Sequence, residues 1–101
     1  MSVDIQVVSW RDIPAQVKVR AGRMRISRPL SDRFQRAIDD AAMRAGKSGS
    51  DEYLTEWRTS APQTREGEPE SAADEFVAEI EAAYPEARLQ ALVAQRGLEA
   101  T

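Results

Sequence analysis

Residues 9–26, SWRDIPAQVKVRAGRMRI, contain the alternation that decides the fold. Ala15, Val17 and Val19 are separated by single polar residues, which is the period of a β-strand with one buried face. Pro14 lacks a backbone N–H group and restricts the residue before it to extended geometry. A strand is therefore expected to begin at this proline or to lie at the edge of a sheet.

The same alternation extends to both sides of this strand. Gly22 can adopt the positive φ that a tight reversal requires, so a neighbouring strand should follow it. Together the segments predict a three-stranded antiparallel meander. The expected apolar face consists of Val3, Ile5, Val7, Val17, Val19, Met24 and Ile26. The expected outer face carries Lys18, Arg20, Arg23 and Arg25.

The stretch RPLSDRFQRAIDDAAMRAG, residues 28–46, indicates an amphipathic helix. Ser31 or Asp32 can cap its free N–H groups, and Gly46 is a typical residue just beyond a helix. The apolar stripe consists of Phe34, Ala37, Ile38, Ala41, Ala42 and Ala45. Because the stripe must be buried, we expect this helix to cover the apolar face of the sheet.

The remaining residues predict two or three further helices in an α+β fold. DEYLTEWRTS, residues 51–60, reads as a short helix with Leu54 and Trp57 on one side. Residues 59–70 contain two prolines, one glycine and no large apolar residue, so they are interpreted as a linker. This divides the chain into an α+β domain over residues 1–58, a linker, and a helical segment over residues 71–98. That last segment is expected to pack on the same domain, although an amphipathic arm that binds elsewhere is the alternative.

Composition excludes several common kinds of site. The chain has 101 residues, which is enough for one domain, and it has no cysteine and no histidine. Disulfides, thiol nucleophiles, thiolate metal sites and histidine-based acid–base chemistry are therefore excluded. The aspartates and glutamates read as solvated helix surfaces. We expect no enzyme, no metal and no cofactor, and we expect a cytoplasmic protein because neither a signal peptide nor a membrane span is visible.

The charge is distributed unevenly along the chain. Residues 1–46 contain nine basic and five acidic residues, whereas residues 47–101 contain five basic and twelve acidic ones. Either the two halves attract each other within one fold, or the basic half presents a surface to an anionic partner.

Three blocks of sequence resemble a known family. They are WRDIPAQV at residues 10–17, RFQRAIDDAAMRAG at 33–46 and DEYLTEWR at 51–58. They are similar to the small bacterial virulence factor domain, which is also a segment of the conserved virulence factor C proteins. The resemblance spans residues 3–58 and implies a stand-alone intracellular module. Relatives are encoded near methylenetetrahydrofolate reductase and methionine-synthesis proteins, which implies an accessory role in one-carbon metabolism. The family has no established catalytic residues to transfer.

Three functions follow from these patterns. The first is a non-enzymatic protein-interaction module, with a one-carbon metabolism enzyme as a candidate partner. Its partner-binding residues would be Trp10, Arg11, Asp12, Gln16, Lys18, Arg20, Arg23 and Arg25. The second is a nucleic-acid or anionic-ligand binder on the basic sheet face, although the acidic composition argues against nucleic acid. The third is a small enzyme or folate-related carrier that uses Arg11, Asp12 and Asp39. Membrane association is not expected, and self-association stays open.

Overall fold

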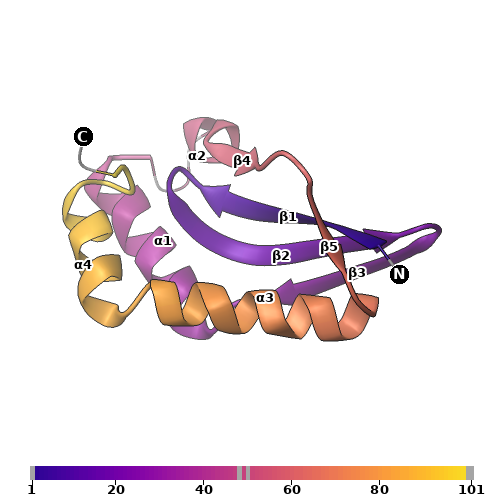
Figure 1. Cartoon of the computed structure of the whole chain (residues 1–101). Coiled ribbons are helices and arrows are strands. Elements are labelled where there is room, and N and C mark those ends of the chain that lie inside the picture. Colours follow the sequence, from indigo (N-terminus) through magenta and orange to yellow (C-terminus); the bar gives the residue numbers. More distant parts are fainter. Residues whose placement is uncertain (1, 48, 50, 100–101) are drawn as a thin grey trace.

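The computed structural model in Figure 1 describes residues 2–47, 49 and 51–99 and shows an α+β fold. The strands are β1 (Ser2–Trp10), β2 (Ile13–Ala21), β3 (Met24–Pro29), β4 (Trp57–Thr59) and β5 (Gln63–Glu66). The helices are α1 (Asp32–Arg44), α2 (Asp51–Thr55), α3 (Pro69–Ala83) and α4 (Glu86–Ala94).

The first three strands form the predicted antiparallel meander. β1 pairs with β2, and β2 pairs with β3, so β2 is central and β3 lies at one edge. Val17 opposes Val7, and Val19 opposes both Ile5 and Ile26. Because residues directly opposite one another in a sheet point to the same face, these apolar side chains share one surface.

The predicted sorting of side chains between the two faces is confirmed in the body of the sheet. Val3, Ile5, Val17 and Val19 are buried, whereas Val7 and Ile26 are half-buried. Met24 is the exception in the expected apolar face, because 54% of its surface is exposed. It directly follows the turn at Gly22 and Arg23, beside the start of α3.

The stretch over residues 59–70, expected to be a linker, instead contains the end of β4, all of β5 and the start of α3, and its strands form the edge of the sheet beside β1. β4 pairs with Val8–Trp10, and β5 pairs with Ser2–Ile5. Between them, Ser60 donates its N–H to the Val7 carbonyl at 2.9 Å. Pro62 interrupts the ladder at the sheet edge, where a missing N–H is tolerated. Pro69 is the first residue of α3. The two prolines thus separate secondary-structure elements and do not mark a flexible connection.

A different helix from the expected one covers most of the sheet. α3 lies along β2 and β3, while α1 contacts the end of β2 and packs chiefly against α4 (Figure 1). Phe34 of α1 is fully buried, as the sequence predicted. The C-terminal segment packs on the same core, which includes Ala73, Ile80 and Leu89.

The helix predicted over residues 51–60 is shorter than expected. α2 ends at Thr55, and Trp57 begins β4 and pairs with Trp10. Leu54 was expected to pack but is 66% exposed. The i, i+3 spacing of Leu54 and Trp57 therefore does not describe one helical face, because the chain changes from helix to strand between them.

Glu81 joins the two longest helices through the start of α1. Its carboxylate accepts hydrogen bonds from the Ser31 N–H at 2.7 Å and from the Ser31 hydroxyl at 2.8 Å. Arg33 Nη2 donates to Glu81 Oε1 at 3.1 Å and to the Glu81 carbonyl at 2.9 Å. Ser31 is the N-terminal cap residue of α1. Its hydroxyl was predicted to bond to the helix backbone, but it makes no such bond. The hydroxyl instead donates to the carboxylate of Glu81, a residue of α3.

These bonds determine how Glu81 titrates. Burial acts to raise the pKa of its carboxyl, but the hydrogen bonds from Ser31 and the charge of Arg33 outweigh it and lower the pKa below 4.5. A carboxyl whose pKa is lower in the folded chain stabilises the fold above its unfolded pKa. That contribution is lost as the pH falls through the folded value.

We therefore expect Glu81→Gln to lower the free energy of unfolding by about 1 kcal/mol at pH 7, the typical net contribution of a hydrogen bond. The difference from the original chain should shrink as the pH falls below about 4. Urea denaturation across this pH range measures it. Glu75→Gln, an exposed change on the same helix, should alter stability by less than about 0.5 kcal/mol. A constant Glu81→Gln loss down to pH 3 would contradict the assignment.

Candidate functional site: the outer basic face

The sheet face away from α3 presents two cross-strand rows of polar side chains. In one row, Lys18 lies between Gln6 of β1 and Ser27 of β3. In the next row, Arg20 lies between Asp4 and Arg25. We call the surface formed by Lys18, Arg20 and Arg25 the outer basic face.

This face is hollowed. A cavity of about 410 Å³ opens over the three strands of the meander. It is lined by Asp4, Gln6, Lys18, Val19, Arg20, Arg25, Ile26, Ser27 and Pro62. The lining therefore brings together cationic groups, an amide and a hydroxyl, which are donors suited to carboxylate or phosphate oxygens.

The positive charge of this face is poorly neutralised. Arg20 has Asp4 as its carboxylate neighbour, at 4.0 Å, and both side chains are solvent-accessible. Within the described part of the chain, Lys18 and Arg25 have no carboxylate at ion-pair distance. Arg20 and Arg25 also oppose each other directly, an arrangement that destabilises a sheet because like charges repel.

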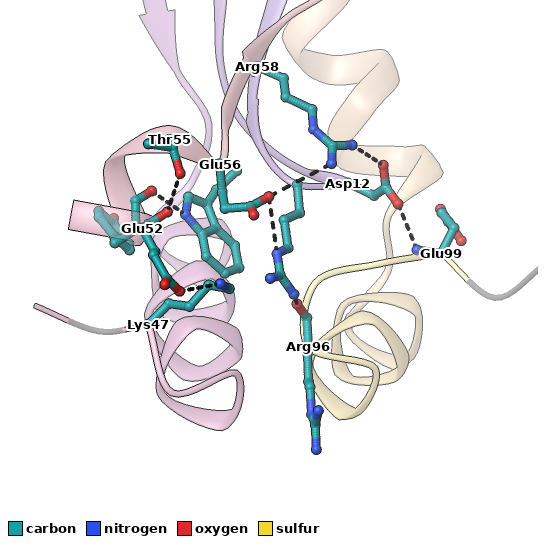
Figure 2. Close-up of polar contacts among 11 residues, drawn as sticks. Asp12, Lys47, Glu52, Thr55, Glu56, Arg58, Arg96 and Glu99 are labelled. Carbon is teal, nitrogen blue, oxygen red and sulfur yellow. Dashed lines mark hydrogen bonds and ion pairs between the residues drawn. The ribbon is translucent and has the colours of Figure 1, made fainter. Parts of the chain in front are cut away.

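The other end of the sheet is a structural junction around the turn between β1 and β2 (Figure 2). Trp10 is fully buried and donates its indole N–H to the Tyr53 carbonyl at 2.9 Å. Its ring stacks on Tyr53 at 5.7 Å between centroids, and Tyr53 meets Trp57 edge-on at 6.0 Å. Trp10 is therefore a core residue and cannot act as the exposed interface anchor that we predicted.

Arg11 is buried in the same junction, with 9% of its surface exposed. Nη1 donates to the Arg96 carbonyl at 2.9 Å, and Nε lies 3.4 Å from the Glu56 carboxylate. That Nε atom makes no aligned hydrogen bond, so the contact with Glu56 is an ion pair alone. The backbone of Arg11 has a φ of 52°, a left-handed conformation that costs about 1 kcal/mol or more in a residue with a side chain.

The Asp12 carboxylate contacts two segments that are distant in the sequence, β4 and the stretch after α4. It lies 3.6 Å from Arg58 and accepts the Glu99 N–H at 2.7 Å (Figure 2). Arg58 in turn lies 3.8 Å from Glu56. Polar groups of Arg11 and Asp12 thus contact residues of the same chain, which gives these two residues a structural role. That they also contact a partner stays a prediction.

The structure separates the predicted partner-binding residues, because Trp10, Arg11 and Asp12 lie in the junction and the others lie elsewhere. Lys18, Arg20 and Arg25 lie together on the outer basic face. Arg23 is exposed in the turn beside that face, outside the residues that line the hollow. Gln16 opposes Val8 and Pro29, one step along β2 from Lys18 towards the junction.

The residues of the enzyme or carrier hypothesis do not form a shared site. Arg11 and Asp12 belong to the junction, where Glu56 and Arg58 engage their charges. Asp39 is exposed on α1 and accepts a hydrogen bond from Gln35, its neighbour one helical turn away. In the described residues, no group of three or more acidic side chains could hold a metal ion.

Asp4, Gln6 and Ser27 also line the face, and the sequence reasoning did not name them. Asp4 and Gln6 alternate with Val3 and Ile5, so the pattern alone indicates that they lie on the outer face of the sheet. Ser27 was missed because its place beside Lys18 depends on the register between β2 and β3.

Comparison with known proteins gives one family. A family model described as Virulence factor matches residues 8–93. The match therefore continues through β4, β5 and α3, well beyond the residues 3–58 that carry the resemblance in the sequence. Neither the curated proteins nor the solved structures provide a match. Among the described helices, none combines the length and the apolar character needed to cross a bilayer.

Gly97 tests the packing of the junction. Its φ is +86°, and a Cβ atom added there would lie 2.9 Å from Trp10 Cζ3. Gly46 has a similar φ of +71° but open space around the same position. Gly46→Ala should therefore lower the free energy of unfolding by about 1 kcal/mol, because of backbone strain. Gly97→Ala should lower it by the same amount plus roughly 1–3 kcal/mol, because the added Cβ overpacks the junction. Urea denaturation followed by tryptophan fluorescence measures both. Equal losses would contradict the close contact with Trp10.

Proposed function

We propose that this chain, which belongs to the virulence factor family, is a non-enzymatic protein-interaction module that binds an acidic segment of a partner protein on its outer basic face. The single observation that carries the proposal is the direct opposition of Arg20 and Arg25, with Lys18 in the next row. A folded chain gains nothing from two neighbouring cations that repel each other. An acidic partner would relieve that repulsion by placing carboxylates between them.

The acidic residues of α3 do not neutralise the charges of Arg20 and Arg25. Their carboxylates engage other cations, with Glu79 bound to Arg65 at 2.6 Å and Asp74 bound to Arg28 at 3.3 Å. α3 packs on the opposite, apolar face of the sheet. The attraction between acidic and basic halves that composition suggested thus operates around α3 and leaves Lys18, Arg20 and Arg25 exposed.

A protein partner is favoured over nucleic acid by two observations. The chain has a net charge of −3, which repels a long polyanion outside the immediate contact. Single-stranded nucleic acid is commonly bound by stacking on exposed aromatic side chains, but Trp10 is fully buried and donates its indole N–H to the Tyr53 carbonyl of α2. A nucleic-acid or small anionic ligand on the same cations is the second candidate.

The absence of an enzymatic role is part of the proposal. The sequence lacks histidine and cysteine, and the hollow of the outer basic face contains one carboxylate, Asp4, beside Arg20. That composition supports binding and offers no acid–base pair. The association with one-carbon metabolism and the cytoplasmic location stay predictions. Recovery of a one-carbon enzyme by the tagged chain would support the first of them.

Charge reversal on the face tests the proposal. In a pull-down with the tagged chain, Lys18→Glu/Arg25→Glu should reduce recovery of a specific partner by about tenfold or more, because two attractive contacts become repulsive. Arg36→Glu/Arg44→Glu makes the same charge change on exposed positions of α1 and should retain the partner. Equal retention or equal loss by the two variants would contradict the proposal. If Lys18→Glu/Arg25→Glu instead lost a bound nucleic acid, and that binding weakened steeply with added salt, the second candidate would be favoured.

A further inference from the structure

We infer that the acidic partner segment binds as an added β-strand along the free edge of β3, with its acidic side chains over the outer basic face. The inference rests on the proposed function, because it names the form in which the acidic partner is recognised. Strand addition obtains affinity from main-chain hydrogen bonds and specificity from alternate side chains.

The register shows which backbone groups of β3 face outward. Leu30 donates its N–H to the Ala15 carbonyl at 3.0 Å, which marks these two residues as a hydrogen-bonded pair. Hydrogen-bonded and non-hydrogen-bonded pairs alternate along an antiparallel ladder. The pairs in register with Leu30 and Ala15 are Arg28 with Val17, Ile26 with Val19, and Met24 with Ala21. The intervening residues of β3, Arg25 and Ser27, therefore direct their N–H and carbonyl groups away from β2.

These outward groups have no strand beside them. β3 is the last strand on its side of the sheet, and Arg25 and Ser27 are both exposed. In the described part of the chain, the Ser27 carbonyl receives one long contact of 3.4 Å from the neighbouring Arg28 side chain. The groups that an added strand would use are thus aligned and accessible.

The two sides of this edge favour different side chains. On the outer side an added strand would lie beside Arg25 and Ser27, next to the row that contains Lys18. On the helix side it would meet Arg28, whose charge is already balanced by Glu70 and Asp74. A further carboxylate there would be repelled by these two acids. The preferred ligand is therefore an extended segment whose acidic residues alternate with apolar ones.

A second copy of the chain is a poor occupant of the same edge. Pairing of β3 with another β3 would bring the outer basic faces of the two copies, each with Arg25 at its edge, next to each other. Sheet edges rich in basic residues oppose such self-association. An acidic segment reverses the sign of this interaction.

The test uses a ten-residue peptide in which glutamate and valine alternate, labelled with a fluorophore and titrated with the full chain. A block peptide of five glutamates followed by five valines has the same composition and charge. We expect the alternating peptide to bind about tenfold more tightly, since it alone can place its acids on one face while forming ladder hydrogen bonds. Lys18→Glu/Arg25→Glu should abolish binding of both peptides.

Backbone methylation of the peptide tests the strand geometry without altering the protein. Only every second amide of an added strand faces β3. Methylation of the glutamate amides and methylation of the valine amides should therefore differ, with one set abolishing binding and the other retaining it. In the chain, Ser27→Pro removes one outward N–H and should weaken binding of the alternating peptide far more than Ser27→Ala, which removes only the side-chain hydroxyl.

The outcomes separate the two proposals. Equal binding of alternating and block peptides, sensitive to Lys18→Glu/Arg25→Glu, would overturn strand addition and leave the acidic-partner proposal standing. Failure of both peptides to bind would count against the acidic partner itself. Self-association that Ser27→Pro abolishes would assign the edge to a second copy and would overturn the inference.

Discussion

The fold depends on the turn at Arg11 and Asp12, which ties three segments of the chain to one end of the sheet. The Arg11 N–H donates to the Glu56 carbonyl at 3.0 Å, and the Asp12 N–H donates to the Gly97 carbonyl at 2.8 Å. Buried backbone groups that lose their partners cost about 1–3 kcal/mol each. The turn therefore fixes the segment before β4 and the segment after α4 at the same point, and Arg11 adopts its left-handed conformation within this turn.

The two ends and two faces of this small sheet have different roles, and the junction accounts for one of them. The aromatic residues Trp10, Tyr53 and Trp57 gather at the turn end and serve stability. α3 covers the apolar face with Ala73 and Ile80 among its core residues. The polar face of β1, β2 and β3 then carries Arg20, which lies 4.0 Å from Asp4, together with Lys18 and Arg25, which have no carboxylate at ion-pair distance among the described residues. Repulsion between neighbouring cations lowers stability, and under the proposed function it is retained because the partner's carboxylates would relieve it.

The sequence predicted the local features well, since they depend on short-range periodicity. Alternation along β2 identified the buried valines and the exposed Lys18 and Arg20. The helix around Phe34 was recognised from its apolar stripe. The features that were missed depend on contacts between distant residues. Trp10 looked available because nothing in its neighbourhood reveals that Tyr53 will cover it. Residues 63–66 lack apolar side chains and looked like a linker, although an edge strand is held by its backbone bonds to β1.

Amide hydrogen exchange of Arg11 and Asp12 in the full chain tests the central claim most directly. Both N–H groups bond to carbonyls of distant segments, so neither can exchange unless the junction opens. Both should exchange as slowly as the amide of Val17 in the central strand, and far more slowly than the amide of Arg23 in the exposed turn at the other end. Exchange of Arg11 and Asp12 at the rate of Arg23 would show that residues 56 and 97 are not held there, and the account of how the outer face is left free would fail.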